Sequence, residues 1–518
     1  MQLSELLNSI PPAWGPVEQL GADSDPTIRS IEIDSRRVAP GALFVAIEGV
    51  NHDGHDHLPE AIENGAVALL VEALPEDFSA DELPVFSVPD TRRALAPVST
   101  AFFGEPSDDL TLVGITGTNG KTSVTYIVES MLKQASWSTG VMGTVEIRYG
   151  QERRRSLNTT PESLDLQRNL RSMHSAGVRA VVMEISSHGL ALGRVAGCKF
   201  RVAAFTNLSQ DHLDFHPDMR DYLDSKLELF GSYLAEGATA VINVDDEVAD
   251  EFLATAKKAG AKLLRVSRNV FSDAEIRLGK HEISIQGTRG ELHLPGTSVS
   301  FEYPLLGSFN LENLLVATGA ALAMDVSPEA IADGISNCPQ VPGRMENVSS
   351  ADSAAPTVIV DYAHTPDAIE KLLESLKPLT DGKLITLFGC GGDRDRSKRP
   401  LMAEAATQFS DRIILTSDNP RTEDPEAILS DVEKGLATFT RTSSEKLAKQ
   451  HKGYCVLPDR RTAIQLAIAV AAPEDTVVIA GKGHEDYQII GRERLPFDDC
   501  REARNALAFL ASKEGGAS

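Results

Sequence analysis

The apolar residues of this chain fall into short runs that predict buried strands alternating with helices. Between residues 109 and 342 the clearest runs are "LTLVGIT" (110–116), "AVVMEIS" (180–186), "AAFTNLS" (203–209) and "TAVINV" (239–244). They are apolar almost throughout instead of alternating, which is typical of strands covered on both faces. This region is therefore expected to hold a mostly parallel sheet between helices.

Two further regions flank this one. Residues 1–108 contain shorter strand-like runs and end in the turn-rich "GEPSDD", which indicates a small N-terminal α/β domain with its own core. A third strand–helix series begins after "CPQVPGRME", with a boundary near residue 343, and predicts a C-terminal Rossmann-like α/β domain over 343–518. Near 270–305 the sequence alternates at strand period with glycine turns, so antiparallel hairpins are expected to pack on the central domain 109–342.

Length and charge narrow the class of protein. A chain of 518 residues exceeds what one core usually serves, so its length predicts two to three domains. Its formal net charge of −25 argues against nucleic acid or an anionic membrane as a general partner. The N-terminus lacks an export signal, and no run approaches a membrane span. The five cysteines are far apart and form no C-x-x-C pair, which favours reduced thiols and a cytoplasmic location.

The stretch "GITGTNGKTS" (114–123) predicts a phosphate-binding loop. It follows an apolar strand and leads into the helix-like "VTYIVESMLKQ", so backbone N–H groups and a helix N-terminus would face an anion. Lys121 would reach the terminal phosphates and the Thr122 hydroxyl would hold Mg²⁺. The loop is a variant, because Ile115 stands where the strict pattern has glycine. Nucleotide binding alone leaves a switch, a hydrolase and a transferase open.

Polar residues follow two other central strands. Glu184 in "MEISSHG" and His212 in "TNLSQDHLDFH" would converge on the phosphate loop, because ligands of open α/β sheets bind beyond the carboxyl ends of the strands. Together with Thr122 they could share a metal site. Lys226 lies just beyond, in the helix-like "DYLDSKLELF", where a single lysine is by default a solvated charge.

The third domain carries three polar loops, each after an apolar strand. "GCGGDRDRSKRPLMA" (389–403), "SDNPRTEDP" (417–425) and "AGKGHEDYQ" (480–488) each contain Arg or Lys and would line one mouth for an anionic substrate. The first is a weaker candidate for a second nucleotide loop, because it lacks the G-K-[ST] ending. The arginine run 153–155 in "RYGQERRR" is interpreted as a solvated hairpin, since no aromatic residue interleaves it.

Taken in order, these stretches resemble the Mur ligases, the ATP-dependent amide-forming enzymes of peptidoglycan synthesis. The resemblance covers essentially the whole chain. It rests on "TGTNGKTS", "LNTTPES", "MEISSHGL", "TNLSQDHLDFH", "DSKLELF", "LLGSFNLEN", "VPGRME", "VDYAHTPDA", "GCGGDRDRSKRP", "DNPR" and "AGKGHEDYQ". Within the family the chain is similar to the tripeptide synthetases, which join an amino acid to UDP-N-acetylmuramoyl-L-alanyl-D-glutamate. Its first domain, with "IEIDSRRVAPGALFVAIEGVNHDG", resembles their uridine-nucleotide domain.

The resemblance implies a mechanism and a set of site residues. ATP would phosphorylate a carboxylate of the nucleotide-dipeptide, and an amine would attack the acyl phosphate. Lys121, Glu184, His212 and a carbamylated Lys226 match the catalytic residues, of which the last three and Thr122 match Mg²⁺ ligands. The ATP contacts would be Gly117, Thr118, Asn119, Gly120, Lys121, Thr122, Ser123, Asn310, Arg344 and Asp361. The nucleotide-dipeptide contacts would be Ile33, Ser35, Val50, Asn51, His52, Asn158, Thr159, Thr160, Ser186, Leu192 and Arg194.

The amino-acid site would consist of third-domain residues: Arg394, Asp418, Asn419, Pro420, Arg421, Gly481 and Glu485. Arg421 in "DNPR" favours meso-diaminopimelate over L-lysine, because its guanidinium can hold the additional carboxylate of diaminopimelate. One departure from the family pattern is Leu192, where relatives often carry a glutamine. The resemblance thus implies cytoplasmic peptidoglycan precursor synthesis, and with it roles in cell wall biogenesis, cell shape and cell division.

Alternative functions remain open at the level of the sequence. They are an L-lysine-adding enzyme, a ligase that adds D-alanyl-D-alanine or polyglutamate, and a non-catalytic scaffold of ligase-like fold. The "DNPR" loop and the first domain argue against the other ligases. A scaffold would be expected to have lost the phosphate loop, Glu184, His212 or Lys226, and all are present.

Overall fold

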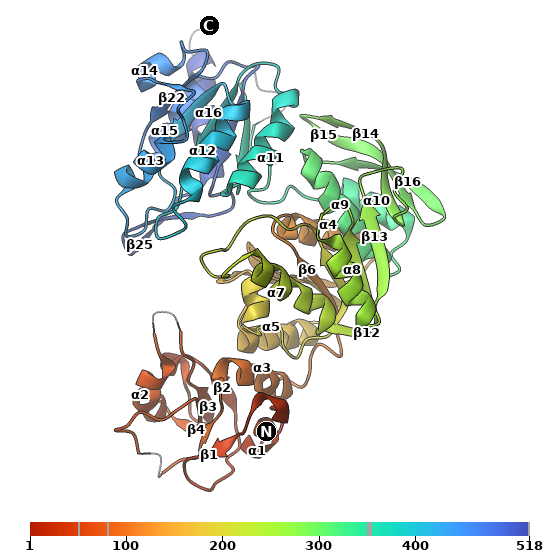
Figure 1. Ribbon diagram of the computed structural model, residues 1–518, viewed down its shortest axis with the longest axis vertical. Coiled ribbons are helices and arrows are strands. Elements are labelled where there is room, and N and C mark those ends of the chain that lie inside the picture. Colours follow the sequence, from red (N-terminus) through yellow and green to blue (C-terminus); the bar gives the residue numbers. More distant parts are fainter. Residues whose placement is uncertain (50–51, 80–81, 350–354, 516–518) are drawn as a thin grey trace.

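A computed structural model of the chain describes residues 1–49, 52–79, 82–349 and 355–515. The described residues form three α/β domains that follow one another along the long axis of the molecule (Figure 1). The N-terminal domain lies at one end, the central domain in the middle and the C-terminal domain at the other end. The predicted fold class is confirmed, whereas the boundaries at 108/109 and 342/343 stay predictions.

The first domain is built on a small sheet. Its described strands are, in spatial order, β1 (Glu18–Gln19), β5 (Val85–Ser87), β4 (Ala66–Val71), β3 (Ala42–Val45) and β2 (Ser30–Glu32). All neighbours pair in parallel except β1 with β5. The accompanying helices are α1 (Leu3–Leu7), α2 (Leu58–Glu63) and α3 (Thr91–Phe102), with 3₁₀ turns η1 (Pro12–Trp14), η2 (Ser35–Arg37) and η3 (Gly54–His57).

The central sheet runs through the middle of the molecule. Its described strands are, in spatial order, β16 (Thr297–Tyr303), β15 (Gly287–Leu294), β14 (Ile276–Ser284), β13 (Lys262–Ser267), β12 (Leu234–Asn243), β11 (Phe200–Phe205), β6 (Thr111–Thr116), β10 (Ala180–Glu184), β7 (Thr139–Met142), β8 (Glu146–Tyr149) and β9 (Glu152–Arg155). The strands from β13 to β7 pair in parallel. This arrangement confirms the expectation drawn from the apolar runs.

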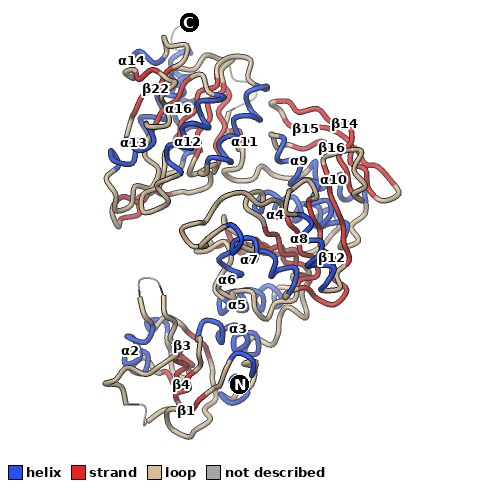
Figure 2. The backbone as a smooth tube through the Cα atoms, in the orientation of Figure 1, coloured by secondary structure: helices blue, strands red, loops and turns tan. Residues whose placement is uncertain are grey.

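Helices cover both faces of the central sheet, as the tube in Figure 2 shows. Val113 and Ile115 of β6 point to one face, where α4 and α9 pack, while Leu112 points to the other. Burial on both faces is the reason that these strands are continuously apolar. The helices of this domain are α4 (Lys121–Gln134), α5 (Ser163–Ser175), α6 (Ser187–Ala191), α7 (Met219–Gly231), α8 (Ala249–Lys258), α9 (Ser308–Leu322) and α10 (Pro328–Ser336).

The predicted hairpins 270–305 are found as β14, β15 and β16, which pair antiparallel. They differ from the expectation in one respect: β14 pairs with β13, so they continue the central sheet instead of packing on it. At the other edge β8 and β9 form the hairpin expected for the arginine run, and every residue of β9 is exposed.

The third domain has a second, mostly parallel sheet. Its described strands are, in spatial order, β17 (Glu346–Asn347), β18 (Thr357–Asp361), β23 (Thr476–Ala480), β19 (Leu384–Phe388), β20 (Arg412–Leu415), β22 (Gly453–Val456) and β21 (Thr440–Arg441), followed by a separate hairpin of β24 (Tyr487–Ile490) and β25 (Glu493–Pro496). Its helices are α11 (Pro366–Leu376), α12 (Lys398–Phe409), α13 (Pro425–Glu433), α14 (Ser444–Leu447), α15 (Arg460–Ala469) and α16 (Asp499–Gly515), with the 3₁₀ turn η4 (Lys377–Leu379).

The five cysteines are all buried and free, as expected for reduced thiols. Among the described helices, none combines the length and the apolar character needed to cross a bilayer.

Candidate active site

The predicted phosphate loop connects β6 to α4. Gly117 and Gly120 have φ angles of +146° and +87°, which side chains rarely adopt. A Cβ at Gly117 would collide with the Thr206 side chain, and one at Gly120 with the Asn313 amide. Glycine is therefore required at both positions, because the backbone turns sharply and neighbouring segments pack directly against it.

Lys121 begins α4 and folds back over the loop. Its Nζ donates to the carbonyls of Gly117 and Thr118, both at 2.9 Å. Burial lowers the pKa of Lys121, while the nearby Glu184 carboxylate opposes this shift. The ammonium is thus held at the loop that would receive phosphates.

Glu184 ends β10 and joins two hydroxyl groups. Its carboxylate accepts from the Thr122 hydroxyl at 2.9 Å, and from the N–H and hydroxyl of Thr144, each at 2.9 Å. Glu184 is 2% exposed, and the bonds of its carboxylate among the described residues come from hydroxyl and backbone N–H groups, with no ion pair. Thr122 and Glu184, 62 positions apart, meet because β6 and β10 are parallel neighbours.

Lys226 lies on α7 and is 1% exposed, so the default interpretation as a solvated charge is wrong. Its Nζ donates to the Gly117 carbonyl at 3.0 Å and lies 4.3 Å from the centre of the Tyr222 ring. Burial, with the Lys121 charge adding to it, holds the pKa of Lys226 well below its ordinary value.

His212 lies on the loop after β11, with a φ angle of +55°. Its ring packs edge-on to His188 at 4.9 Å and its Nε2 is 3.6 Å from the Asp211 carboxylate. Burial lowers the pKa of His212 to about 4, so the imidazole is neutral near pH 7. Across the described residues, no group of three His, Cys, Asp or Glu side chains is arranged to hold a metal ion. Of the four predicted ligands only Glu184 and His212 are of these residue types, since the other two are Thr122 and Lys226.

Third-domain residues reach the loop. Nη2 of Arg344 donates to the Thr122 hydroxyl at 3.3 Å, and its guanidinium lies 4.5 Å from the Tyr362 ring centre. Asp361 instead accepts the backbone N–H groups of Met345 and Ala363 at 2.7 and 2.8 Å. Arg344 is thus brought to the predicted nucleotide site, while Asp361 supports the backbone beside it.

The other predicted ATP contact, Asn310, is buried at the start of α9. Its amide donates to the Leu306 carbonyl at 2.7 Å and accepts from Asn313 at 2.9 Å. Asn313 also stands against Gly120, so Asn310 is tied to the phosphate loop through one side chain.

The predicted nucleotide-dipeptide residues fall into two groups. Thr160 bonds to the Ser186 backbone N–H and to the Glu184 carbonyl, both at 2.9 Å, and Arg194 donates to the Thr160 carbonyl at 3.1 Å. Leu192 is half-buried beside them.

In the first domain, Ser35 donates to Glu60 at 2.6 Å, Ile33 packs on the core, and His52 is exposed. Val50 and Asn51 lie outside the described residues.

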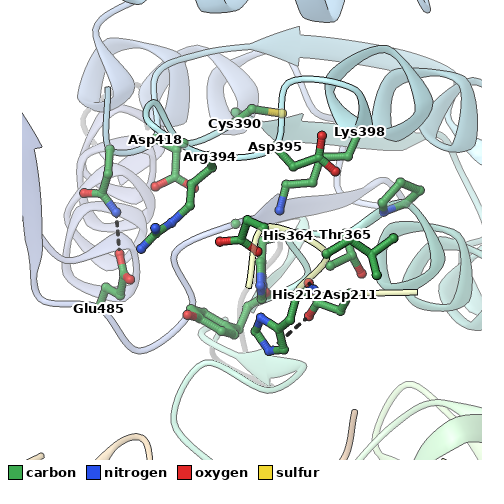
Figure 3. A pocket seen from close by; sticks show the side chains of 18 of the residues that line it. Asp211, His212, His364, Thr365, Cys390, Arg394, Asp395, Lys398, Asp418 and Glu485 are labelled. Carbon is green, nitrogen blue, oxygen red and sulfur yellow. Dashed lines mark hydrogen bonds and ion pairs between the residues drawn. The ribbon is translucent and has the colours of Figure 1, made fainter. Parts of the chain in front are cut away.

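A cavity of about 640 Å³ lies between the central and third domains (Figure 3). Within the described chain no first-domain residue lines it. The predicted site residues that line it are Asn158, Thr159, His212, Arg394, Asp418, Asn419, Arg421, Gly481 and Glu485. The structure therefore brings two of the predicted dipeptide contacts, Asn158 and Thr159, and most of the amino-acid site to one cavity.

The amino-acid loop is held in a strained conformation. Arg421 has a φ angle of +53°, and its Nη1 donates to the Gly392 carbonyl at 2.7 Å. Glu485 accepts from the Asn419 amide and from the buried Lys482, each at 2.8 Å. Pro420 does not line the cavity.

Several cavity residues escaped the sequence analysis. Asp211, His364 and Lys398 point into it beside His212 (Figure 3), and Asp367 lines it while accepting from Asn119 of the phosphate loop at 3.3 Å. All four lie within stretches quoted in the sequence analysis: Asp211 in "TNLSQDHLDFH", His364 and Asp367 in "VDYAHTPDA", and Lys398 in the loop 389–403. A wider reading of the same signal would therefore have found them. The Asn119–Asp367 bond connects the loop to the cavity.

The fold and the site are those of a multidomain α/β protein of the nucleotide-binding class, in which a phosphate loop faces the polar loops of another domain. Comparison with family models gives matches to the Mur ligase family catalytic domain over residues 27–103, the Mur ligase middle domain over 115–321, and the Mur ligase glutamate ligase domain over 343–483. The chain belongs to the Mur ligase family.

Similar proteins carry a more particular name. The chain is 43% identical over 528 aligned residues to UDP-N-acetylmuramoyl-L-alanyl-D-glutamate–2,6-diaminopimelate ligase of Geobacter metallireducens, covering 100% of both chains. It is 44% identical to the ligase of that name from Gloeobacter violaceus, covering 94% of this chain and 96% of the other. A solved structure of a ligase with that name is 34% identical, with a TM-score of 0.64 over 93% of this chain and 95% of the other.

A more distant structure, MurF from Acinetobacter baumannii, shares the fold. It has a TM-score of 0.65 at 19% identity and covers 92% of this chain and 94% of the other.

Proposed function

We propose that this protein is an ATP-dependent ligase that adds meso-diaminopimelate to UDP-N-acetylmuramoyl-L-alanyl-D-glutamate in peptidoglycan precursor synthesis. The observation that carries the proposal is the cavity that joins the central domain, with its phosphate loop, to the Arg421 loop of the third domain. The names of the similar ligases support the same substrates.

Amide formation requires that the substrate carboxylate first be activated, because a carboxylate has no leaving group for an amine to displace. Transfer of the γ-phosphoryl group of ATP to a substrate carboxylate oxygen gives an acyl phosphate and ADP. The neutral amine of the amino acid then attacks the carbonyl carbon to form a tetrahedral intermediate, which loses a proton from nitrogen and expels phosphate to give the amide. Both steps depend on positioning and charge neutralisation, and neither needs an enzyme nucleophile.

The residues at the loop suit that role. Lys121 and Arg344 would neutralise charge on the phosphates, one from the central and one from the third domain. Because Arg344 contacts the Thr122 hydroxyl from another domain, this contact would form only when the central and third domains are in contact.

The side chains fit Mg²⁺. Glu184 is a buried carboxylate beside two hydroxyl groups and without an ion-pair partner in the described chain, an oxygen donor set that suits a hard cation. Thr122 and Glu184 would hold one ion, and neutral His212 with a carbamylated Lys226 would hold a second. Bound Mg²⁺ would neutralise charge on the transferred phosphoryl group.

Lys226 has the properties that carbamylation requires. A neutral amine adds to CO₂ and releases one proton, which leaves an anionic carbamate. The buried Lys226 amine, with its lowered pKa, populates the neutral form far more than a surface lysine does.

The test is a paired assay of phosphate release and peptide product. ATP turnover should require both the nucleotide-dipeptide and meso-diaminopimelate, with one phosphate released for each amide formed. Lys121→Ala should remove essentially all turnover while the protein keeps its thermal unfolding temperature. Equal ATP hydrolysis without the dipeptide would indicate a plain NTPase and contradict the proposal.

The reaction is placed in the cytoplasm as part of the proposal. The five free, buried cysteines and the use of ATP both suit a reducing, nucleotide-rich compartment.

A further inference from the structure

The arginine run 153–155 of the β8–β9 hairpin contacts the third domain through one of its side chains. Its last residue, Arg155, forms an ion pair at 2.9 Å with Asp486 of the third domain. Its guanidinium also lies 4.6 Å from the centre of the Tyr487 ring. One side chain of the central domain therefore makes both a charge contact and an aromatic contact with the segment that begins β24.

Two guanidinium groups lie close to the Tyr487 ring. The Arg494 guanidinium lies 3.6 Å from its ring centre, in addition to that of Arg155. The Tyr487 hydroxyl donates to Glu485 at 3.3 Å, and Glu485 lines the cavity of the amino-acid site. Cations over the faces of an aromatic ring attract it, so the ring's orientation is coupled to Arg155.

The strand that starts with Tyr487 is bonded directly to the amino-acid loop. The backbone N–H of Arg421 donates to the Ile489 carbonyl at 3.1 Å, and the Ile489 N–H donates to the Asn419 side chain at 2.9 Å. The Gln488 amide donates to the Asp418 carbonyl at 2.7 Å. A displacement of β24 would therefore move the loop that carries Arg421.

Arg155 also lies just before the other substrate segment in the chain. It ends β9, and the chain continues within five residues to Asn158, Thr159 and Thr160, the predicted dipeptide contacts. Asn158 and Thr159 line the main cavity and also a neighbouring cavity of about 500 Å³, whose wall includes Arg155 and Tyr487. The contact of Arg155 with the third domain thus lies between the two segments that would carry the reacting groups.

We propose that Arg155 is a positioning residue for the amide-forming step: through Asp486 and Tyr487 it holds the amino-acid loop against the dipeptide segment. This inference rests on the proposed function and adds a residue to it. Arg155 does not touch the reacting atoms. Its loss should weaken use of the amino acid and leave ATP binding at the loop of Lys121 unchanged.

The expected effect is moderate because the contact is partly solvated. The side chain of Arg155 is 43% exposed and that of Asp486 is 63% exposed. An exposed ion pair together with a cation–π contact corresponds to roughly a 3- to 30-fold change in an equilibrium.

The experiment measures the KM for meso-diaminopimelate and for ATP in Arg155→Ala. The KM for diaminopimelate should rise by roughly 3- to 30-fold, whereas the KM for ATP should stay within about twofold of the wild type. Arg289→Ala is the matched control, because it removes an exposed arginine–glutamate ion pair from another hairpin. Among the described residues that hairpin contributes nothing to either cavity.

A charge exchange separates positioning from general stability. Arg155→Asp should impair diaminopimelate use at least as strongly as Arg155→Ala, and adding Asp486→Arg should restore part of it. Any one of three results would overturn the inference while the proposed function stands. They are a double variant that uses diaminopimelate no better than Arg155→Asp, an equal rise of the KM for diaminopimelate and the KM for ATP, and an Arg155→Ala variant with the same KM values as Arg289→Ala. A wild-type enzyme that forms no amide would overturn both.

Discussion

Replacing Arg421 with alanine is expected to remove the preference for meso-diaminopimelate over L-lysine. Arg421 lines the cavity between the domains, and of its guanidinium nitrogens only Nη1 has a hydrogen-bond partner within the described chain, the Gly392 carbonyl at 2.7 Å. The remaining N–H groups are available for a substrate carboxylate. Diaminopimelate has this carboxylate at the far end of its side chain and lysine does not.

The magnitude follows from the lost contact. A hydrogen bond between charged groups contributes about 1.5–3 kcal/mol, and about 1.4 kcal/mol corresponds to a factor of ten. The kcat/KM for diaminopimelate should therefore fall roughly ten- to a hundredfold or more. The backbone should be unaffected, because a φ angle of +53° is similarly unfavourable for alanine and arginine. The bonds of the Arg421 N–H to the Ile489 carbonyl and of the Arg421 carbonyl to the Gly491 N–H are retained.

The assay is phosphate release with saturating ATP and nucleotide-dipeptide, titrated with each amino acid. Arg421→Lys is the control: it keeps the charge without the planar fork and should give an intermediate loss. Thermal unfolding of each variant checks that the fold is intact. If wild-type enzyme uses L-lysine as well as diaminopimelate, or if Arg421→Ala keeps the wild-type preference, Arg421 does not read the second carboxylate.

Three further predictions concern buried groups. Lys226→Met should abolish ligation yet leave the unfolding temperature unchanged or higher, because a buried amine without an ion-pair partner in the described chain is replaced by an apolar side chain; retained turnover or a marked loss of stability would contradict this. Burial lowers the pKa of His484 to about 3, whereas an unfolded histidine has a pKa of about 6.5. Between these two pH values the imidazole is protonated in the unfolded state and neutral in the folded state. The resulting stability is complete above about pH 6.5 and is lost as the pH falls towards 3; His484→Asn should flatten the unfolding temperature over that range, and an unchanged profile would refute the assignment. Arg460→Met should lower the free energy of unfolding by about 3–5 kcal/mol, because the buried Asp499 loses both of its 2.7 Å bonds, and adding Asp499→Leu should recover most of the loss in a denaturant titration.

Much of the fold followed from local signals. A strand that is buried on both faces must be apolar throughout, so runs such as 110–116 and 180–186 predicted the parallel sheet. The phosphate loop was equally readable, because its glycines and Lys121 are needed within a few consecutive residues. The hairpin at the arginine run was also predicted, from a local charge run without interleaved aromatic residues.

The tertiary structure decided what surrounds each of these residues. Helical spacing does not reveal which element covers a helix face, so the residues alone left Lys226 a surface charge by default, and only the family resemblance marked it as a site residue. The structure places its Nζ 3.0 Å from the Gly117 carbonyl. The contact of Thr122 with Glu184 depends on β6 and β10 being neighbours in the sheet.

The contacts between domains could not be predicted from the sequence. Arg155 meets Asp486 across 331 intervening steps of the chain (486 − 155), and Arg344 meets Thr122 across 222. Each contact depends on how whole domains are placed against each other, and that placement results from many weak contacts summed over both surfaces. The sequence by itself determined the parts of this protein, their chemistry and the grouping of the three third-domain loops at one mouth. The tertiary structure alone decided how that mouth faces the central domain, because this depends on the placement of whole domains.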